Sequence, residues 1–116
     1  MKKQLEARTK QFALKVIRLI TGLPPTKVID VLGRQLLKSG TSIGANYREA
    51  NRAQSRDDFI HKIAICEKEA AETEYWIELL SESGLGHRTA LQPLLAESRE
   101  LLAIFVASGR TAKKSL

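Results

Sequence analysis

The chain of 116 residues has few cysteines, few aromatic residues and no long uncharged run. Its one cysteine, Cys66, cannot form a disulfide within the chain, so the sequence suits a reducing compartment. No uncharged run exceeds nine residues, and therefore no segment is expected to span a bilayer. Aromatic residues make up only 5% of the chain, and none interleaves with the basic residues as base-stacking platforms would.

The amino end begins with Met1, Lys2 and Lys3, as a signal peptide often does, but charged residues interrupt the apolar segment that should follow. We therefore expect a cytoplasmic protein without membrane contact. The length fits one compact domain, which we expect over residues 1–109. Residues 110–116 are basic and lack an apolar pattern, so we expect a flexible tail there.

Apolar residues recur at helical spacing along the chain, and no stretch alternates as a half-buried strand would. The pattern therefore predicts an all-α protein. Four helices are expected. The first spans about residues 3–21, and the second runs from its N-cap Thr26 to about Ala53. The third runs from its N-cap Ser55 to about residue 83, and the fourth from Thr89 to about residue 109. Because short loops join them, we predict an antiparallel up-down-up-down four-helix bundle.

The second predicted helix contains Gly33, Gly40 and Gly44, each costing about 1 kcal/mol relative to alanine. A break near residues 39–41 is one interpretation. A seven-residue repeat across the glycines favours a continuous helix; it consists of Ile29, Leu36, Ile43 and Ala50.

The third helix has the clearest pattern, with apolar or small residues spaced alternately by four and three. This spacing is typical of the seam of a left-handed helix bundle. The seam consists of Phe59, Ile63, Cys66, Ala70, Thr73, Ile77 and Leu80. We expect Cys66 to be a packed, inert thiol.

The net charge of +6 is unevenly distributed: residues 1–53 carry +8, residues 54–84 carry −5 and residues 85–116 carry +3. One interpretation is that the basic first two helices contact the phosphates of RNA or DNA, without sequence preference and in a salt-sensitive way. The candidate residues are Lys10, Lys15, Arg18, Arg34, Lys38, Arg48 and Arg52. The other interpretation is that these cations form solvated faces or ion pairs.

The charge separation also permits the basic side of one copy to meet the acidic helix of another in a closed ring. Asn46 falls on a helix seam, where a buried amide fixes register or oligomeric state, or contacts a ligand. Tyr75 and Trp76 lie beside the main seam and pack either on another copy or on an adjacent helix. The candidate interface or structural polar residues are Asn46, Glu49, Glu72, Tyr75 and Trp76.

The sequence contains fragments of catalytic and metal-binding motifs, but each lacks the neighbouring residues or elements that its chemistry requires. Residues 40–44 match the G-x-S-x-G nucleophile elbow around Ser42, but no predicted strand precedes them. The histidines, the cysteine and the acidic residues lack metal-ligand spacing, and the sequence contains no glycine-rich phosphate loop. We therefore expect a non-enzymatic protein with no catalytic residue, metal or cofactor.

Three stretches carry a family resemblance: residues 39–50 (SGTSIGANYREA), 58–63 (DFIHKI) and 68–80 (KEAAETEYWIELL). They resemble the bacterial intervening-sequence proteins of large-subunit ribosomal RNA, sometimes labelled ribosomal protein. The resemblance is strong over about residues 26–82 and rests on helix pattern elsewhere. The chain departs from it in having Glu49-Ala50 where many members have Glu-Gly, and Cys66-Glu67 where they have Gly-Ser.

This resemblance implies an antiparallel four-helix bundle that is frequently a homopentamer, and some relatives are encoded inside ribosomal RNA genes. The family is similar to the accessory variability determinant of diversity-generating retroelements, whose basic pentameric barrels bind a reverse transcriptase and nucleic acid. It brings no catalytic residues. We therefore expect an oligomeric basic scaffold that binds RNA or DNA through its first two helices, with a partner protein such as a reverse transcriptase. The alternative is a protein-only adaptor or assembly module.

Overall fold

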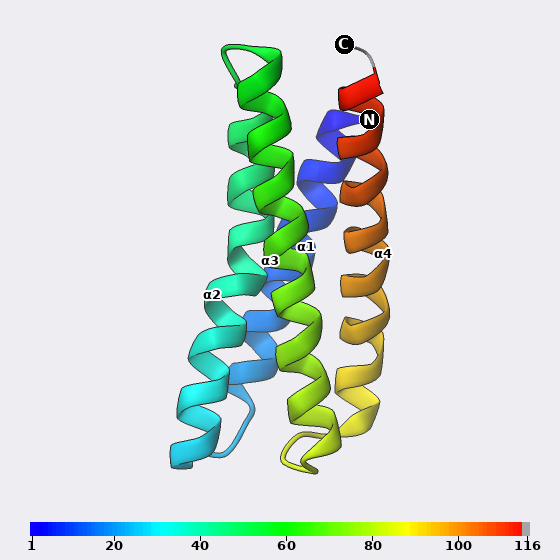
Figure 1. The fold of residues 1–116 in the computed structure, drawn as a ribbon. Helices are drawn as coiled ribbons and strands as arrows, with labels where there is room; N and C mark the ends of the chain where they lie inside the picture. Colours follow the sequence, from blue (N-terminus) through cyan, green and yellow to red (C-terminus); the bar gives the residue numbers. More distant parts are fainter. Residues whose placement is uncertain (115–116) are drawn as a thin grey trace.

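The computed structural model describes residues 1–114, which form four α-helices joined by short loops (Figure 1). The helices are α1 (Lys2–Thr21), α2 (Lys27–Ala50), α3 (Arg56–Glu82) and α4 (Arg88–Lys114). They run alternately in opposite directions, so both termini lie at the same end of the bundle (Figure 1). The predicted all-α, antiparallel four-helix bundle is thus confirmed. Of these helices, none is both long and apolar enough to cross a membrane.

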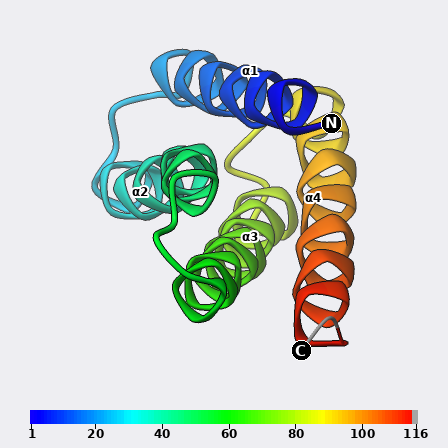
Figure 2. The same ribbon diagram turned by 90° about the horizontal axis from the view of Figure 1, so that it is seen from above.

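The four helices form a ring of neighbours when viewed down the bundle (Figure 2). α2 packs closely on α1 and on α3, and α3 packs closely on α4. The fourth side, between α1 and α4, is much the loosest. The bundle is therefore least tightly closed along its α1/α4 side.

Thr26 and Ser55 are the N-caps of α2 and α3, as the sequence predicted. Thr26 Oγ1 accepts a hydrogen bond of 3.1 Å from the amide of Ile29, and Ser55 Oγ accepts one of 3.0 Å from the amide of Asp58. Each bond satisfies an amide that has no partner within its helix. α4 differs from expectation because it begins at Arg88, one residue before Thr89.

α4 also ends later than the sequence pattern indicated. Residues 110–114 were expected to belong to a flexible tail, but they continue the helix to Lys114. Their composition explains this difference, since Arg, Ala and Lys favour helix and cations interact favourably with a helix C-terminus. The part of the expected tail at residues 115–116 lies outside the described residues.

α2 is continuous across its glycines, and the packing against α1 explains why they are tolerated. A β-carbon at Gly40 would stand 3.1 Å from Val16 Cγ2, and one at Gly44 would stand 3.0 Å from Thr9 Oγ1. The missing side chains thus let α1 approach α2 closely. The predicted α3 seam is buried from Ile63 to Leu80, while Phe59 is half-buried and packs against the core.

Candidate nucleic-acid interface

The fold divides the seven predicted phosphate-binding cations among several faces. Lys10, Arg48 and Arg52 line a surface between α1 and α2. Lys15 and Arg18 instead face α4 across the other side of α1. The structure therefore does not bring all seven cations together.

The remaining two cations, Arg34 and Lys38, lie away from both of these faces. Arg34 forms an ion pair with Asp30, one turn earlier in α2. Lys38 lies close enough to Glu69 of α3 to favour the ionised carboxylate there. Neighbouring carboxylates therefore partly offset both charges.

The surface between α1 and α2, called here the α1/α2 groove, is shallow and has a floor of small residues. Its first hollow has a volume of about 310 Å³ and places Lys10 of α1 and Arg48 of α2 among those small residues. A second hollow of about 610 Å³ continues the groove past Arg48 toward the chain termini and adds Lys2, Lys3 and Arg52. The floor of the first hollow consists of Thr9, Ala13, Thr41, Gly44 and Ala45.

Two carboxylates border this groove, and both have partners. Glu6 Oε2 accepts a hydrogen bond of 2.8 Å from Asn51 Nδ2. Glu49 Oε2 lies 3.4 Å from Lys62 Nζ of α3. Lys10 and Arg48 are exposed, and neither forms an ion pair within residues 1–114. The groove thus presents Lys10 and Arg48 without a direct ion pair, while Glu6, bonded to the neutral amide of Asn51, keeps its negative charge in the same hollow.

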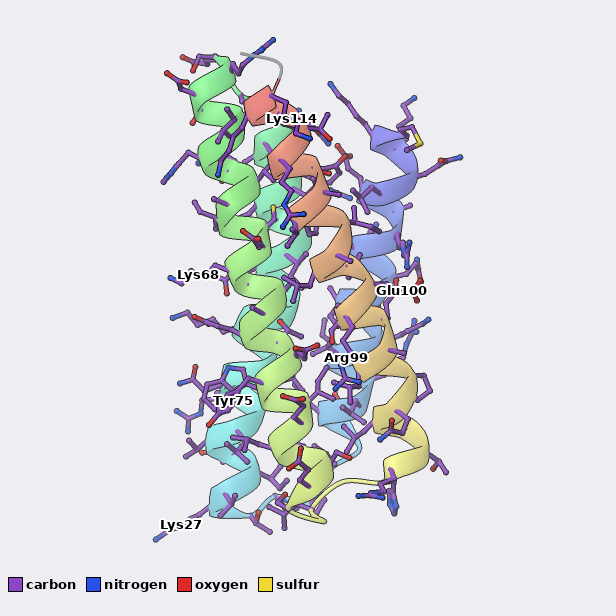
Figure 3. All side chains as sticks on the ribbon, turned by 45° about the vertical axis from the view of Figure 1, so that its right-hand side comes forward. Lys27, Lys68, Tyr75, Arg99, Glu100 and Lys114 are labelled. Carbon is purple, nitrogen blue, oxygen red and sulfur yellow. The ribbon has the colours of Figure 1, made fainter. Side chains whose placement is uncertain are left out.

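The antiparallel fold also gathers charge at one end of the bundle. Residues 1–14, 39–66 and 101–114 form the part nearest the termini, called here the basic end, and carry eleven Lys and Arg against four Asp and Glu. Residues 15–38 and 67–100 carry eight against nine. Lys114 and Lys27 mark the two opposite ends in Figure 3. The basic end therefore carries +7 and the rest of these residues −1.

Some acidic residues of α3 form ion pairs with α4 inside the same bundle. Arg99 of α4 lies between two of them, with Nε 3.0 Å from Glu74 Oε2 and NH2 3.2 Å from Glu78 Oε2 (Figure 3). Partial burial, and secondarily the charge of Glu72, raise the pKa of Glu69. The α3 surface is therefore less strongly anionic than its sequence indicates.

The five predicted interface or structural residues do not form one cluster. Asn46 is half-buried, and its Nδ2 donates a hydrogen bond of 2.8 Å to the Ser42 carbonyl of its own helix. Glu49 pairs with Lys62, as described above, and Glu72 is exposed. Asn46 thus satisfies its amide locally, which the seam pattern did not predict.

Tyr75 and Trp76 form an edge-to-face pair whose ring centroids are 5.1 Å apart. Tyr75 is 52% exposed on the outside of α3, whereas Trp76 is half-buried and packs against the core (Figure 3). Trp76 Nε1 is buried and has no hydrogen-bond partner among the described residues. Trp76 therefore packs within its own bundle, as one of the two alternatives predicted, while Tyr75 remains accessible to another copy.

The residues that suggested chemistry lie in unreactive settings. Ser42 is in the middle of α2, where its Oγ donates to the Lys38 carbonyl, so the strand-to-helix turn of a nucleophile elbow is not formed. Cys66 is fully buried, and burial raises the pKa of its thiol to about 12. Residues 1–114 contain no group of three or more His, Cys, Asp or Glu side chains that could hold a metal ion.

Sequence reasoning missed the contribution of the carboxyl-terminal residues Arg110, Lys113 and Lys114 to the basic end. An even number of antiparallel helices places both termini at one end of the bundle, so these three cations could have been predicted to lie beside the amino-terminal lysines. They were instead assigned to a flexible tail.

Comparison with known proteins agrees with this architecture. The sequence matches the model of the 23S rRNA-intervening sequence protein family over residues 2–107. A crystal structure of a protein with unknown function from the S23 ribosomal protein family of Bacteroides thetaiotaomicron VPI-5482 is similar, with 40% identity and a TM-score of 0.81. The alignment covers 88% of this chain and 94% of that chain. No curated protein matches. The chain therefore belongs to the 23S rRNA-intervening sequence protein family.

Proposed function

We propose that this protein is a non-enzymatic, oligomeric scaffold that binds the phosphates of RNA or DNA along the α1/α2 groove and the basic end. The observation that carries the proposal is that Lys10 and Arg48 meet from two helices at one groove without an ion pair among the described residues. The second hollow extends the same row with Lys2, Lys3 and Arg52.

The form of this surface favours backbone binding over base recognition. A row of cations neutralises phosphates regardless of sequence, and the row lacks aromatic side chains on which bases could stack. Binding should therefore be similar for different sequences and should fall steeply with salt.

The test is a salt titration of binding to random-sequence RNA and duplex DNA by fluorescence anisotropy. We expect log K to fall linearly with log salt between about 50 and 200 mM. The double variant R48Q/R52Q should weaken binding to every sequence and flatten the salt slope by about 2, one for each lost phosphate contact.

The matched control is R34Q/K38Q, which removes the same charge from the amino-terminal half of the same helix. It should leave the salt slope nearly unchanged. An equal loss in both variants would show that only net charge matters and would refute the groove as the site. Negligible binding even at low salt would reject nucleic-acid binding and favour the protein-only adaptor.

The oligomeric part of the proposal is supported by Tyr75, which is half exposed beside the half-buried Trp76. The pair leaves an apolar surface for a second copy or a protein partner such as a reverse transcriptase. Sedimentation velocity over a range of concentrations tests self-association. A monomer at every concentration would remove this part while leaving phosphate binding to be judged by the titration.

A further inference from the structure

A second concave site lies between α1 and α4, on the other side of α1 from the α1/α2 groove. It has a volume of about 350 Å³, near the lower end of the range typical of small-molecule sites, about 300–1,000 Å³. Its apolar lining consists of Leu19 from α1 and Ala90, Pro93 and Leu94 from α4. The size and lining suit one small molecule with an apolar body.

The cleft lies on the loosest side of the bundle, between α1 and α4. Arg8 reaches from α1 to α4, where its Nε and NH2 donate hydrogen bonds of 2.7 Å to the two carboxylate oxygens of Glu97. Ala90 and Pro93 line the cleft from α4 and are exposed, and Leu19 of α1 is only half-buried. The cleft therefore leaves apolar surface of both helices open to a ligand.

The charges at the cleft favour an anion. Lys15 and Arg18 stand at its α1 side, are exposed and form no ion pair within residues 1–114. Glu97, the carboxylate that lines the cleft, already has both oxygens bound to Arg8. Two cations beside an apolar surface are therefore left for a ligand.

We propose that this cleft binds a small amphipathic carboxylate of the medium-chain fatty-acid class. The alkyl chain packs on Leu19 and Pro93, above the buried Leu94, and the carboxylate lies between Lys15 and Arg18. An apolar cation would meet the two positive side chains, and a neutral alcohol would gain no charge pairing. This site is independent of the proposed nucleic-acid surface because it uses none of the cations of the α1/α2 groove.

The probe is decanoate at pH 7, below its micelle-forming concentration, with decanol and decyltrimethylammonium for comparison. We expect decanoate to shift the methyl NMR signals of Leu19 and Leu94 in a saturable way, and to bind more tightly than either comparison compound. Equal binding of the three compounds, or the absence of saturable shifts at these two leucines, would overturn the proposal.

Two charge-matched variants test the role of the cations. K15Q/R18Q should weaken decanoate binding about tenfold, as expected for two exposed charge contacts. K10Q/R48Q removes the same charge on the other side of α1; it should leave decanoate binding unchanged while weakening RNA binding. If both variants lose decanoate equally, the attraction is nonspecific and the site is refuted. Circular dichroism verifies folding, which these exposed positions should preserve.

A third variant, Ala90→Leu, fills the cleft without removing charge. It should abolish the decanoate-induced shifts at Leu19 while leaving the helical spectrum intact. Undiminished decanoate binding in this folded variant would contradict the proposed location. Ala90→Ser adds little volume and should bind decanoate as the wild type does.

Discussion

Thr9 and Gly44 are packed so closely that a β-carbon on residue 44 would stand 3.0 Å from Thr9 Oγ1 and 3.2 Å from Thr9 Cβ. The Thr9 hydroxyl lies 3.0 Å from the carbonyl oxygens of both Leu5 and Glu6, which restrains its rotation. This contact sets how closely α1 and α2 approach. It therefore also sets the spacing of Lys10 and Arg48 across the α1/α2 groove.

The substitution Gly44→Val should destabilise the bundle by about 2–3 kcal/mol, because its side chain needs space that Thr9 occupies. Urea unfolding followed by circular dichroism measures the change. RNA binding should weaken as well, since the helices must separate and move Lys10 away from Arg48.

Gly33→Ala is the control for this substitution. A β-carbon at Gly33 would meet Ile20 Cγ2 at 3.4 Å, an ordinary contact, so the better helix propensity of alanine should raise stability by up to about 1 kcal/mol. If Gly33→Ala were as harmful as Gly44→Val, close packing against Thr9 could not be the cause.

Arg8→Ala should lower the free energy of unfolding by about 1 kcal/mol, because it removes the two-bond bridge to Glu97 on the loosest side of the bundle. Arg8 and Glu97 side chains are 38% and 22% exposed, so the loss should shrink at high salt. Urea unfolding at low and high salt measures both effects. Arg34→Ala, which breaks an exposed pair within one helix, should change stability by less than about 0.5 kcal/mol.

Cys66 should make stability depend on pH in the alkaline range. Burial raises the pKa of its thiol from 9.0 to about 12, so the folded state favours the neutral thiol and the unfolded chain releases the proton first. Its contribution is therefore complete below pH 9 and is lost as the pH rises toward 12. The stability advantage of the wild type over Cys66→Ala should shrink by about 1.4 kcal/mol between pH 8 and about pH 10.

Urea unfolding of both proteins across this pH range measures the difference, and a constant difference would contradict the assignment. A thiol reagent provides a second measurement, since the thiolate is the reactive form. At pH 8 the folded protein should react far more slowly than the urea-unfolded chain.

Trp76→Phe should cost less than about 1 kcal/mol, because the loss of packing is offset by removal of a buried N–H that has no partner among residues 1–114. Ile77→Ala, at a fully buried neighbour, should cost about 2–5 kcal/mol. Urea unfolding compares the two. A loss in Trp76→Phe as large as that in Ile77→Ala would contradict the absence of an acceptor and would point to one supplied by another copy.

The order of helices and the two side-chain caps could be predicted because they depend on neighbouring residues. Thr26 and Ser55 each bond an amide three residues later, so the hydroxyl and its partner appear together in the sequence. The position of Asn46 on a helix seam predicted a buried amide. In the structure Asn46 is only half-buried, and its amide bonds the Ser42 carbonyl of its own helix. The carboxyl-terminal extension of α4 was missed because that stretch lacks an apolar pattern, although its residues favour helix.

The sequence by itself determined that the chain forms four helices with one apolar side each, because periodic side chains and local caps act within a few turns. It also assigned the net charges of its segments. Only the tertiary structure decided which charges act together: it placed Lys10 and Arg48 along one groove, turned Lys15 and Arg18 toward α4, and brought the two chain ends into one basic end. The physical reason is that electrostatic interaction depends on distance in space, and the antiparallel packing of the helices sets that distance.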